Sequence, residues 1–364
     1  MVIINVLHYG LILSQPYDIT RGLRDIGINA DYALWDDYGE NWLIKGWDEN
    51  LNMDKIKHPF KLFKTKTQMA KFISKVSIKY DIIHFHSRPT MCYENHLLST
   101  YSDTKFLKKL GKKLFVSFWG CDIRNWKNDI KYKWSPCNRC QPSRKLYCSI
   151  ANYKTITAAR KYCNAMFSSG DLKIEYPEMI WGNLAIDTKD ISPDIKHNIP
   201  EKYVIPRDSD EILIYHAFGN SGKRPDVKGS GYIEKAMANL IQKGYNIKYM
   251  FVDNVPIQDI KYIQVQADIV IDQLCAGWYG TNAVECMALG KPVISYLRDD
   301  ILKICPNENL PVINANPDTI EQTIANTIDN KSYLNNTGEI SRRYTTKYHD
   351  RTEVAKEFLK YYNL

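Results

Sequence analysis

The sequence contains no long hydrophobic run, no low-complexity tract and no long block of like charges. Residues 1–13 are apolar, but a helix needs about 20 apolar residues to cross a bilayer. The same stretch lacks the basic segment and the small-residue cleavage site of a signal peptide. We therefore expect a buried first strand at this end of the chain and a cytoplasmic protein.

Nine cysteines without a secretory signal predict reduced thiols rather than a disulfide framework. Four of them lie close together in the sequence: Cys137, Cys140, Cys148 and Cys163. The first two have the C-x-x-C spacing of a zinc knuckle, and the other two could complete a tetrahedral site. Because the second pair is not itself a C-x-x-C, unliganded cysteines in a loop insertion are the alternative. In both cases the role is structural, and we predict no cofactor.

The net charge of +8 is unevenly distributed. Residues 51–190 hold about 26 Lys and Arg against about 11 Asp and Glu. This excess suits an anionic partner, such as a lipid headgroup, a phosphorylated lipid carrier or an acidic glycan, and a peripheral contact with the inner face of the membrane. A solvated lysine-rich surface explains the charge equally well. No aromatic-basic motif accompanies it, so we expect no nucleic-acid partner.

Short apolar runs alternate with longer amphipathic stretches, a pattern typical of βα units around parallel sheets. The 364 residues are enough for two domains, and the segment 191–210, rich in Pro, Asp and Lys, is typical of a linker. We expect an α/β fold with two doubly wound, Rossmann-like domains, one over 1–195 and one over 205–341. Strands are expected at 2–7, 29–34, 81–86, 113–119, 211–216, 247–252, 267–272 and 292–296.

The richest segment, 271–293, combines a strand, a glycine-containing loop and the start of a helix. Free N–H groups at a helix N-terminus, with the helix dipole behind them, form a site for a diphosphate. We assign this role to the backbone at Gly280, Thr281 and Asn282, and the glycines at 277 and 280 would let it approach the ligand closely. Ligands of open α/β sheets lie beyond the carboxyl ends of the strands, which is where this loop falls.

This segment resembles the retaining GT-B glycosyltransferases, the large family that includes sucrose, glycogen and lipopolysaccharide sugar-transferring enzymes. The family motif is EGFG, four residues, then EAMAxGxPV; this chain has GWYG at 277–280 and ECMALGKPV at 285–293. Glu285 matches the second Glu, which in the family accepts hydrogen bonds from the donor ribose. Gly277 replaces the first Glu, which usually lies near the transferred sugar. The alternative for Glu285 is a capping box with Asn282, in which it only closes the helix start.

A second segment, 216–229, resembles the first loop of the family's nucleotide domain, in which an Arg and the Lys of a Lys-Gly pair hold the donor diphosphate. Lys228 matches that Lys, and Arg224, or less closely Lys223, matches the Arg. Two fixed cations would stabilise the charge that develops on the leaving diphosphate without a metal. The glycine spacing is not that of a Walker A loop. An exposed basic loop is the alternative.

Two motifs of the N-terminal half extend the resemblance. DIIHFH at 81–86 resembles the family's DVVHxH strand, and FWGCDIR at 118–124 resembles its HGxD turn, with Trp119 where the family often has a His that meets the donor sugar. A structural hydrogen-bond network is the alternative for the histidines. The resemblance assigns four residues to the acceptor side of the cleft: Gly10, His84, Asp122 and Arg124.

As a whole, the resemblance implies two Rossmann-like domains facing across a cleft, with the last helix, 342–364, packing back on the N-terminal domain. It implies transfer of a sugar from a nucleotide diphosphate sugar to a glycan, lipid-linked or protein acceptor, with retention of configuration and no metal ion. Three alternatives remain open: a catalytically inactive GT-B subunit that binds another glycosyltransferase, a UDP-sugar epimerase, and a structural or nucleic-acid-binding protein.

Overall fold

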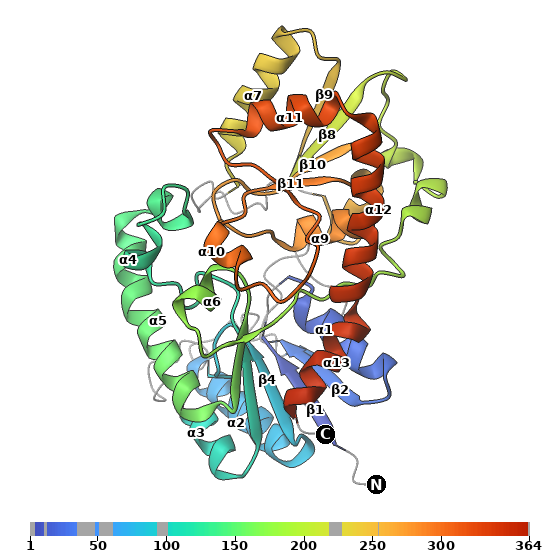
Figure 1. The fold of residues 1–364 in the computed structure, drawn as a ribbon. Coiled ribbons are helices and arrows are strands. Elements are labelled where there is room, and N and C mark those ends of the chain that lie inside the picture. The colour runs from blue at the N-terminus through green and yellow to red at the C-terminus, as the bar shows by residue number, and fades with distance from the viewer. Residues whose placement is uncertain are drawn as a thin grey trace. The chain divides into compact units, whose positions relative to one another are not determined.

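The computed structural model describes residues 4–10, 13–34, 48–50, 61–92, 101–217, 228–253 and 255–362. The chain divides into two compact units, each containing a parallel sheet (Figure 1). Unit 1 comprises Met1–Arg124, Tyr147–Ala185 and Arg351–Leu364, and unit 2 comprises Asn125–Leu146 and Ile186–Asp350. Within the described residues, no helix is both long enough and apolar enough to cross a membrane.

The sheet of unit 1 has seven described strands, in the order β3-β2-β1-β4-β5-β6-β7, and all neighbours pair in parallel. Their bounds are β1 Asn5–Tyr9, β2 Asn29–Leu34, β3 Glu49–Asn50, β4 Ile82–His86, β5 Lys113–Ser117, β6 Ala165–Ser168 and β7 Ile180–Trp181. The order 3-2-1-4-5-6 is that of the Rossmann fold, and it reverses between β1 and β4. All five residues of β4 are buried, as expected of a strand covered on both faces.

The helices of unit 1 are α1 Gln15–Asp25, α2 Lys61–Lys79, α3 Ser102–Lys109, α6 Asp171–Glu175, α13 Arg351–Tyr362 and most of α5 Pro142–Tyr162. The last helix of the chain, α13, packs closely on α1. A Cβ added at Gly22 of α1 would lie 2.1 Å from the carbonyl oxygen of Arg351. Arg351 also pairs with Asp25 at the end of α1, with Nε–Oδ2 2.7 Å. The first and last parts of the chain therefore share one core.

Unit 2 has five described strands in the order β12-β11-β10-β8-β9, again all parallel. They are β8 Ile212–Ala217, β9 Ile247–Val252, β10 Ile269–Ile271, β11 Val293–Ser295 and β12 Ile313–Asn314. Counted from β8, this is the flavodoxin-like order 2-1-3-4-5, which reverses between β8 and β10. The helices are α4 Trp126–Asp129, α7 Ser230–Gln242, α8 Ile260–Gln264, α9 Thr281–Ala288, α10 Asp299–Leu302, α11 Ile320–Ile328 and α12 Lys331–Tyr348, with short 3-10 helices η2 Pro136–Arg139, η3 Pro193–His197 and η4 Glu201–Tyr203.

The units differ from the predicted domains in three places. Residues 125–146 and 186–195, predicted in the N-terminal domain, belong to unit 2, where the Tyr132 hydroxyl donates to Asp300 at 3.0 Å. The predicted terminal helix 342–364 is two helices, α12 and α13, because the backbone between them pairs with the chain at Ile186, whose N–H donates to His349 O at 2.9 Å. Only α13 belongs to unit 1.

Candidate functional site

A fully buried carboxylate, Asp272, directly follows β10 in unit 2. It forms an ion pair with Lys228, with Nζ–Oδ1 2.5 Å, and accepts the backbone N–H of Gly280 at 2.8 Å. The side-chain amide of Asn282 lies 3.4 Å from the same carboxylate. Asp272, which sequence analysis did not identify, therefore holds together the two segments predicted to bind the diphosphate.

The Lys228-Gly229 pair is fixed onto the loop that follows β10. The carbonyl oxygen of Lys228 accepts the N–H of Leu274 at 2.9 Å. Gly229 has φ +79°, and a Cβ there would lie 3.1 Å from Leu274 Cβ. An ammonium group has three donors, so Lys228 can keep its bond to Asp272 and still donate to phosphate oxygens. Lys223 and Arg224 lie in 218–227, outside the described residues.

Helix α9 begins after Gly280, whose extended backbone (φ −110°, ψ −175°) occupies the N-cap position. Asn282 is then the second residue of the helix, so the capping box with Glu285 is excluded. Instead, the Gln264 amide nitrogen lies 3.1 Å from Asn282 Oδ1 and 3.2 Å from Glu285 Oε2. Glu285 is 9% exposed, and its carboxylate is held by Gln264 instead of capping the helix.

Gly277, which stands in place of the family's first Glu, packs directly on Arg298. It has φ +77°, and an added Cβ would lie 2.5 Å from Arg298 Cδ. Arg298 is itself 6% exposed and pairs with Asp300, with Nη2–Oδ2 2.5 Å. Its guanidinium lies 3.3 Å from the centre of the Tyr132 ring. No side chain fits at position 277 unless Arg298 moves, so the local packing itself requires glycine there.

In unit 1, the loop after β1 lies against the end of β4, at the reversal of strand order. Gly10 has φ +115°, and a Cβ there would lie 2.6 Å from His86 O. His8 Nδ1 and His86 Nε2 are 2.9 Å apart, both within the buried interior. The close contact explains why this turn contains glycine.

His84 is fully buried, and both of its ring nitrogens are engaged. Nδ1 lies 2.6 Å from the Tyr362 hydroxyl, and Nε2 lies 2.8 Å from Ser117 Oγ. Burial lowers the pKa of His84, and the neighbouring histidines lower it further. The structure thus places His84 in the core of unit 1 with both ring nitrogens hydrogen-bonded. Its assignment to the acceptor side stays a prediction.

The turn after β5 is organised by Asp122. Its carboxylate accepts the backbone N–H groups of Trp119 at 3.0 Å and Gly120 at 2.8 Å. Burial raises the pKa of Asp122 to about 6, although these hydrogen bonds act in the opposite direction. Arg124 forms a two-point ion pair with Asp171, with N–O distances of 2.6 and 3.1 Å. Both predicted residues therefore hold the shape of this turn.

Two further side chains of unit 1 stand out, because each has a buried nitrogen without a hydrogen-bond partner in the described part of the chain: His86 Nδ1 and Trp119 Nε1. Their rings stack, with centroids 5.9 Å apart. Buried polar groups are normally paired, so these two nitrogens are open to hydrogen bonds with a water molecule or a ligand. Sequence analysis assigned neither residue to the site. The indication in the sequence was Trp119 itself, which stands where the GT-B glycosyltransferases often have a His.

The four clustered cysteines are not assembled in the structure. All four lie within the described range 101–217, and no group of three or more His, Cys, Asp or Glu that could hold a metal ion occurs among the described residues. Cys140 precedes α5 and Cys163 follows it, and a helix of 21 residues separates its ends by about 30 Å. The predicted zinc site at Cys137, Cys140, Cys148 and Cys163 is therefore wrong.

Comparisons of the whole chain with known proteins give structural matches only. No protein-family model matches the sequence, and no curated protein sequence matches it. Among solved structures, HepE from Anabaena in complex with UDP and glucose is similar with a TM-score of 0.60 at 10% identity, covering 99% of both chains.

Two other solved structures cover the chain equally well. Sucrose-phosphate synthase from Thermosynechococcus elongatus has a TM-score of 0.58 at 12% identity, covering 99% of this chain and 98% of that one. A UDP-N-acetylglucosamine 2-epimerase has a TM-score of 0.53 at 11% identity, covering 100% and 97%. With two parallel α/β sheets and this coverage, the chain has the GT-B fold.

Proposed function

We propose that this chain is a glycosyltransferase whose unit 2 binds a nucleoside diphosphate sugar at the β8/β10 reversal. The observation that carries the proposal is the cluster around Asp272, which brings Lys228 and the start of α9 together at the carboxyl edge of the sheet. Open α/β sheets bind nucleotides where their strand order reverses. HepE, which has the same fold, was solved with UDP and glucose.

Each part of the nucleotide sugar then has a group of the protein that binds it. Lys228, with Lys223 and Arg224, binds the diphosphate, and the first N–H groups of α9 add to it because they have no partner within the helix. Glu285 accepts hydrogen bonds from the ribose hydroxyls. These cations and N–H groups stabilise the negative charge that grows on the diphosphate as the sugar leaves, so no metal ion is needed.

Unit 1 binds the acceptor, which is a glycan, a lipid-linked molecule or a protein. Gly10, Asp122 and Arg124 shape its site, and the unpaired nitrogens of His86 and Trp119 are available to the ligand. In the reaction, the bond from the sugar to the diphosphate breaks and a bond to the acceptor hydroxyl forms with retention of configuration. The departing phosphate oxygen takes the hydroxyl proton. The basic stretch 51–190 suits a peripheral membrane contact.

Donor turnover tests the proposal. UDP-, ADP- and GDP-sugars are incubated with the chain and candidate acceptors, and release of the free nucleotide is measured. The decisive variant is Lys228→Met with Asp272→Asn, which removes both charges and so leaves no unpaired buried charge. We expect it to fold and to lose about 100-fold or more in kcat/KM. Lys235→Met, an exposed lysine of α7, is the control. Turnover that survives in the double variant would overturn the assignment of Lys228.

A catalytically inactive GT-B subunit is the second candidate, and the Arg298 side chain packed under Gly277 favours it. That side chain fills the place next to the position of the family's first Glu, which usually lies near the transferred sugar. An inactive subunit would bind a nucleotide without turning over any donor. An epimerase would instead interconvert the donor sugar in the absence of an acceptor, which proton NMR of the donor detects.

A further inference from the structure

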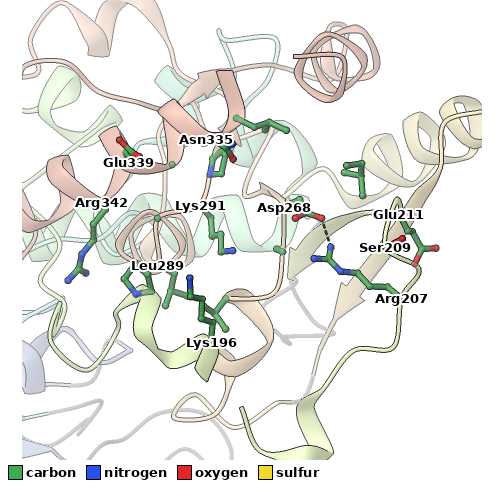
Figure 2. A pocket seen from close by; sticks show the side chains of 18 of the residues that line it. Lys196, Arg207, Ser209, Glu211, Asp268, Leu289, Lys291, Asn335, Glu339 and Arg342 are labelled. Atoms are coloured by element: carbon green, nitrogen blue, oxygen red, sulfur yellow. Dashed lines mark hydrogen bonds and ion pairs between the residues drawn. The ribbon is translucent and has the colours of Figure 1, made fainter. Parts of the chain in front are cut away.

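One cavity of unit 2 (Figure 2) is lined by residues other than those of the candidate donor loop. Its volume is about 930 Å³, and it is lined at the amino ends of three strands by Ile212 of β8, Asp268 before β10 and Pro292 before β11. η3 and α12 supply other walls. Asp272 follows the opposite, carboxyl end of β10, so this cavity and the candidate donor site lie at opposite edges of one sheet.

Five cations line this cavity: Lys196, Arg207, Lys291, Arg342 and Arg343. Two are already engaged, because Arg207 pairs with Asp268 and Arg342 donates to three backbone carbonyls. The side chains of Lys196, Lys291 and Arg343 form no hydrogen bond or ion pair within the described residues; Lys196 and Arg343 are exposed and Lys291 is half-buried. Figure 2 shows Lys196 and Lys291 reaching into the cavity from separate elements, η3 and the turn between α9 and β11.

The acidic residues of the lining do not balance these amino groups. Asp268 is paired with Arg207 and also accepts the N–H of Leu213 at 2.8 Å. Glu211 lies 3.7 Å from Lys248, and the two other acids, Asp210 and Glu339, are exposed. Among the lining residues, the half-buried amine of Lys291 has no acidic partner at ion-pair distance, so the inner part of the cavity favours an anion.

Of these three cations, Lys291 is the least exposed. Burial lowers the pKa of its amine, Asp268 raises it, and Arg207 and Lys196 lower it. An anion bound between Lys196 and Lys291 would relieve both the desolvation of Lys291 and its repulsion by the neighbouring cations. The positions of Lys196 and Lys291 and their charge therefore both favour a bound anion.

We propose that this cavity binds a small molecule carrying one or two phosphate groups, with Lys196 and Lys291 as its main ligands. Two ammonium groups from separate elements, with Arg343 also in the lining, match the charge of a phosphate dianion better than that of a carboxylate. Pockets for small ligands have volumes of about 300–1,000 Å³, so the cavity can hold an organic group as well as the phosphate. The proposal does not depend on the function proposed for the donor loop.

Site-resolved acetylation tests the proposed phosphate site on the chain without any substitution. The rate of acetylation of each lysine is measured by mass spectrometry with and without inorganic pyrophosphate or glucose 1-phosphate at about 10 mM, enough to saturate a site with a Kd of about 1 mM or below. We expect slower acetylation of both Lys196 and Lys291, and no change at the exposed Lys303 of unit 2. Lys228 reports separately on the donor loop. Protection of neither cavity lysine, or of only one, would overturn the proposal.

Calorimetry of Lys291→Gln gives an independent measurement. Loss of one charged hydrogen-bond donor should weaken binding of the protecting ligand about tenfold or more, while Lys303→Gln binds as the wild type does. Thermal unfolding without ligand checks that both variants fold. Equal affinity in Lys291→Gln and the wild type would contradict the site. Tighter binding of glucose 1-phosphate indicates a phosphate ester as the ligand, and tighter binding of pyrophosphate indicates an inorganic one.

Discussion

His8, His84 and His86 lie next to one another in unit 1, with ring centroids 5.0 to 5.2 Å apart. All three are buried. Burial lowers the pKa of each, that of His8 to about 3 from an ordinary value of 6.5. The fold therefore holds them in the neutral form, and the unfolded chain takes up protons first as the pH falls below 6.5.

From this we predict that the free energy of unfolding is highest above pH 6.5 and falls as the pH drops toward about 5, by up to about 1.4 kcal/mol per pH unit for each histidine. Urea unfolding across this range measures the slope. His86→Gln should reduce the slope, whereas His197→Gln, which changes an exposed histidine, should leave it unchanged. A stability that is constant from about pH 7 to 5 would contradict three neutral buried histidines.

Single residues of the candidate donor site differ in how well the sequence predicts them. Lys228, Gly280 and Glu285 were predictable, because each belongs to a local pattern of glycines and charges. Asp272 was not, since an Asp after a strand is common and its partner Lys228 lies 44 residues earlier in the chain. The packing of Arg298 against Gly277 was not predictable from the sequence either.

At the scale of elements, the contact between α1 and α13 ties the last helix to unit 1. It depends on the absence of a side chain at Gly22, where a Cβ would lie 2.1 Å from a backbone oxygen of α13. A backbone atom cannot turn aside as a side chain can, so the helices would have to separate to admit a methyl group.

Accordingly, Gly22→Ala should lower the free energy of unfolding by about 1–3 kcal/mol or more. The matched control is Gly231→Ala in α7, where an added Cβ meets nothing within 4 Å. The control should be neutral or stabilise by up to about 1 kcal/mol, because alanine restricts the unfolded chain. Urea unfolding followed by circular dichroism compares the two, and equal stabilities would show that α1 and α13 do not pack this closely.

Helices and strands could be predicted where they depend only on the sequence pattern within the segment itself. The strands predicted at 29–34 and 247–252 have the same bounds as β2 and β9. The break between α12 and α13 was not predicted. It depends on the pairing of Ile186 with the chain at His349 and Asp350, and the spacing of apolar residues along a helix does not reveal such a pairing. The transfer of 125–146 to unit 2 rests on similarly distant contacts, such as that of Tyr132 with Asp300.

At the scale of the whole molecule, each unit carries a cluster of buried polar groups at its own strand-order reversal. In unit 2 the cluster surrounds Asp272, and in unit 1 it contains His86 next to Gly10. Residues of unit 1 come from the beginning, middle and end of the chain. Each unit therefore has a candidate ligand site at its strand-order reversal, and we propose that the one in unit 2 binds the nucleotide.

Titration calorimetry of UDP, ADP and GDP in the presence of a chelator, and again with magnesium, tests this claim most directly. We predict that one of the three nucleotides binds with the same affinity in both conditions. Glu285→Ala should weaken that nucleotide about tenfold or more by removing the ribose acceptor, whereas Glu234→Ala, an exposed residue of α7, should not. Binding of no nucleotide, or binding that Glu285→Ala leaves unchanged, would contradict the account.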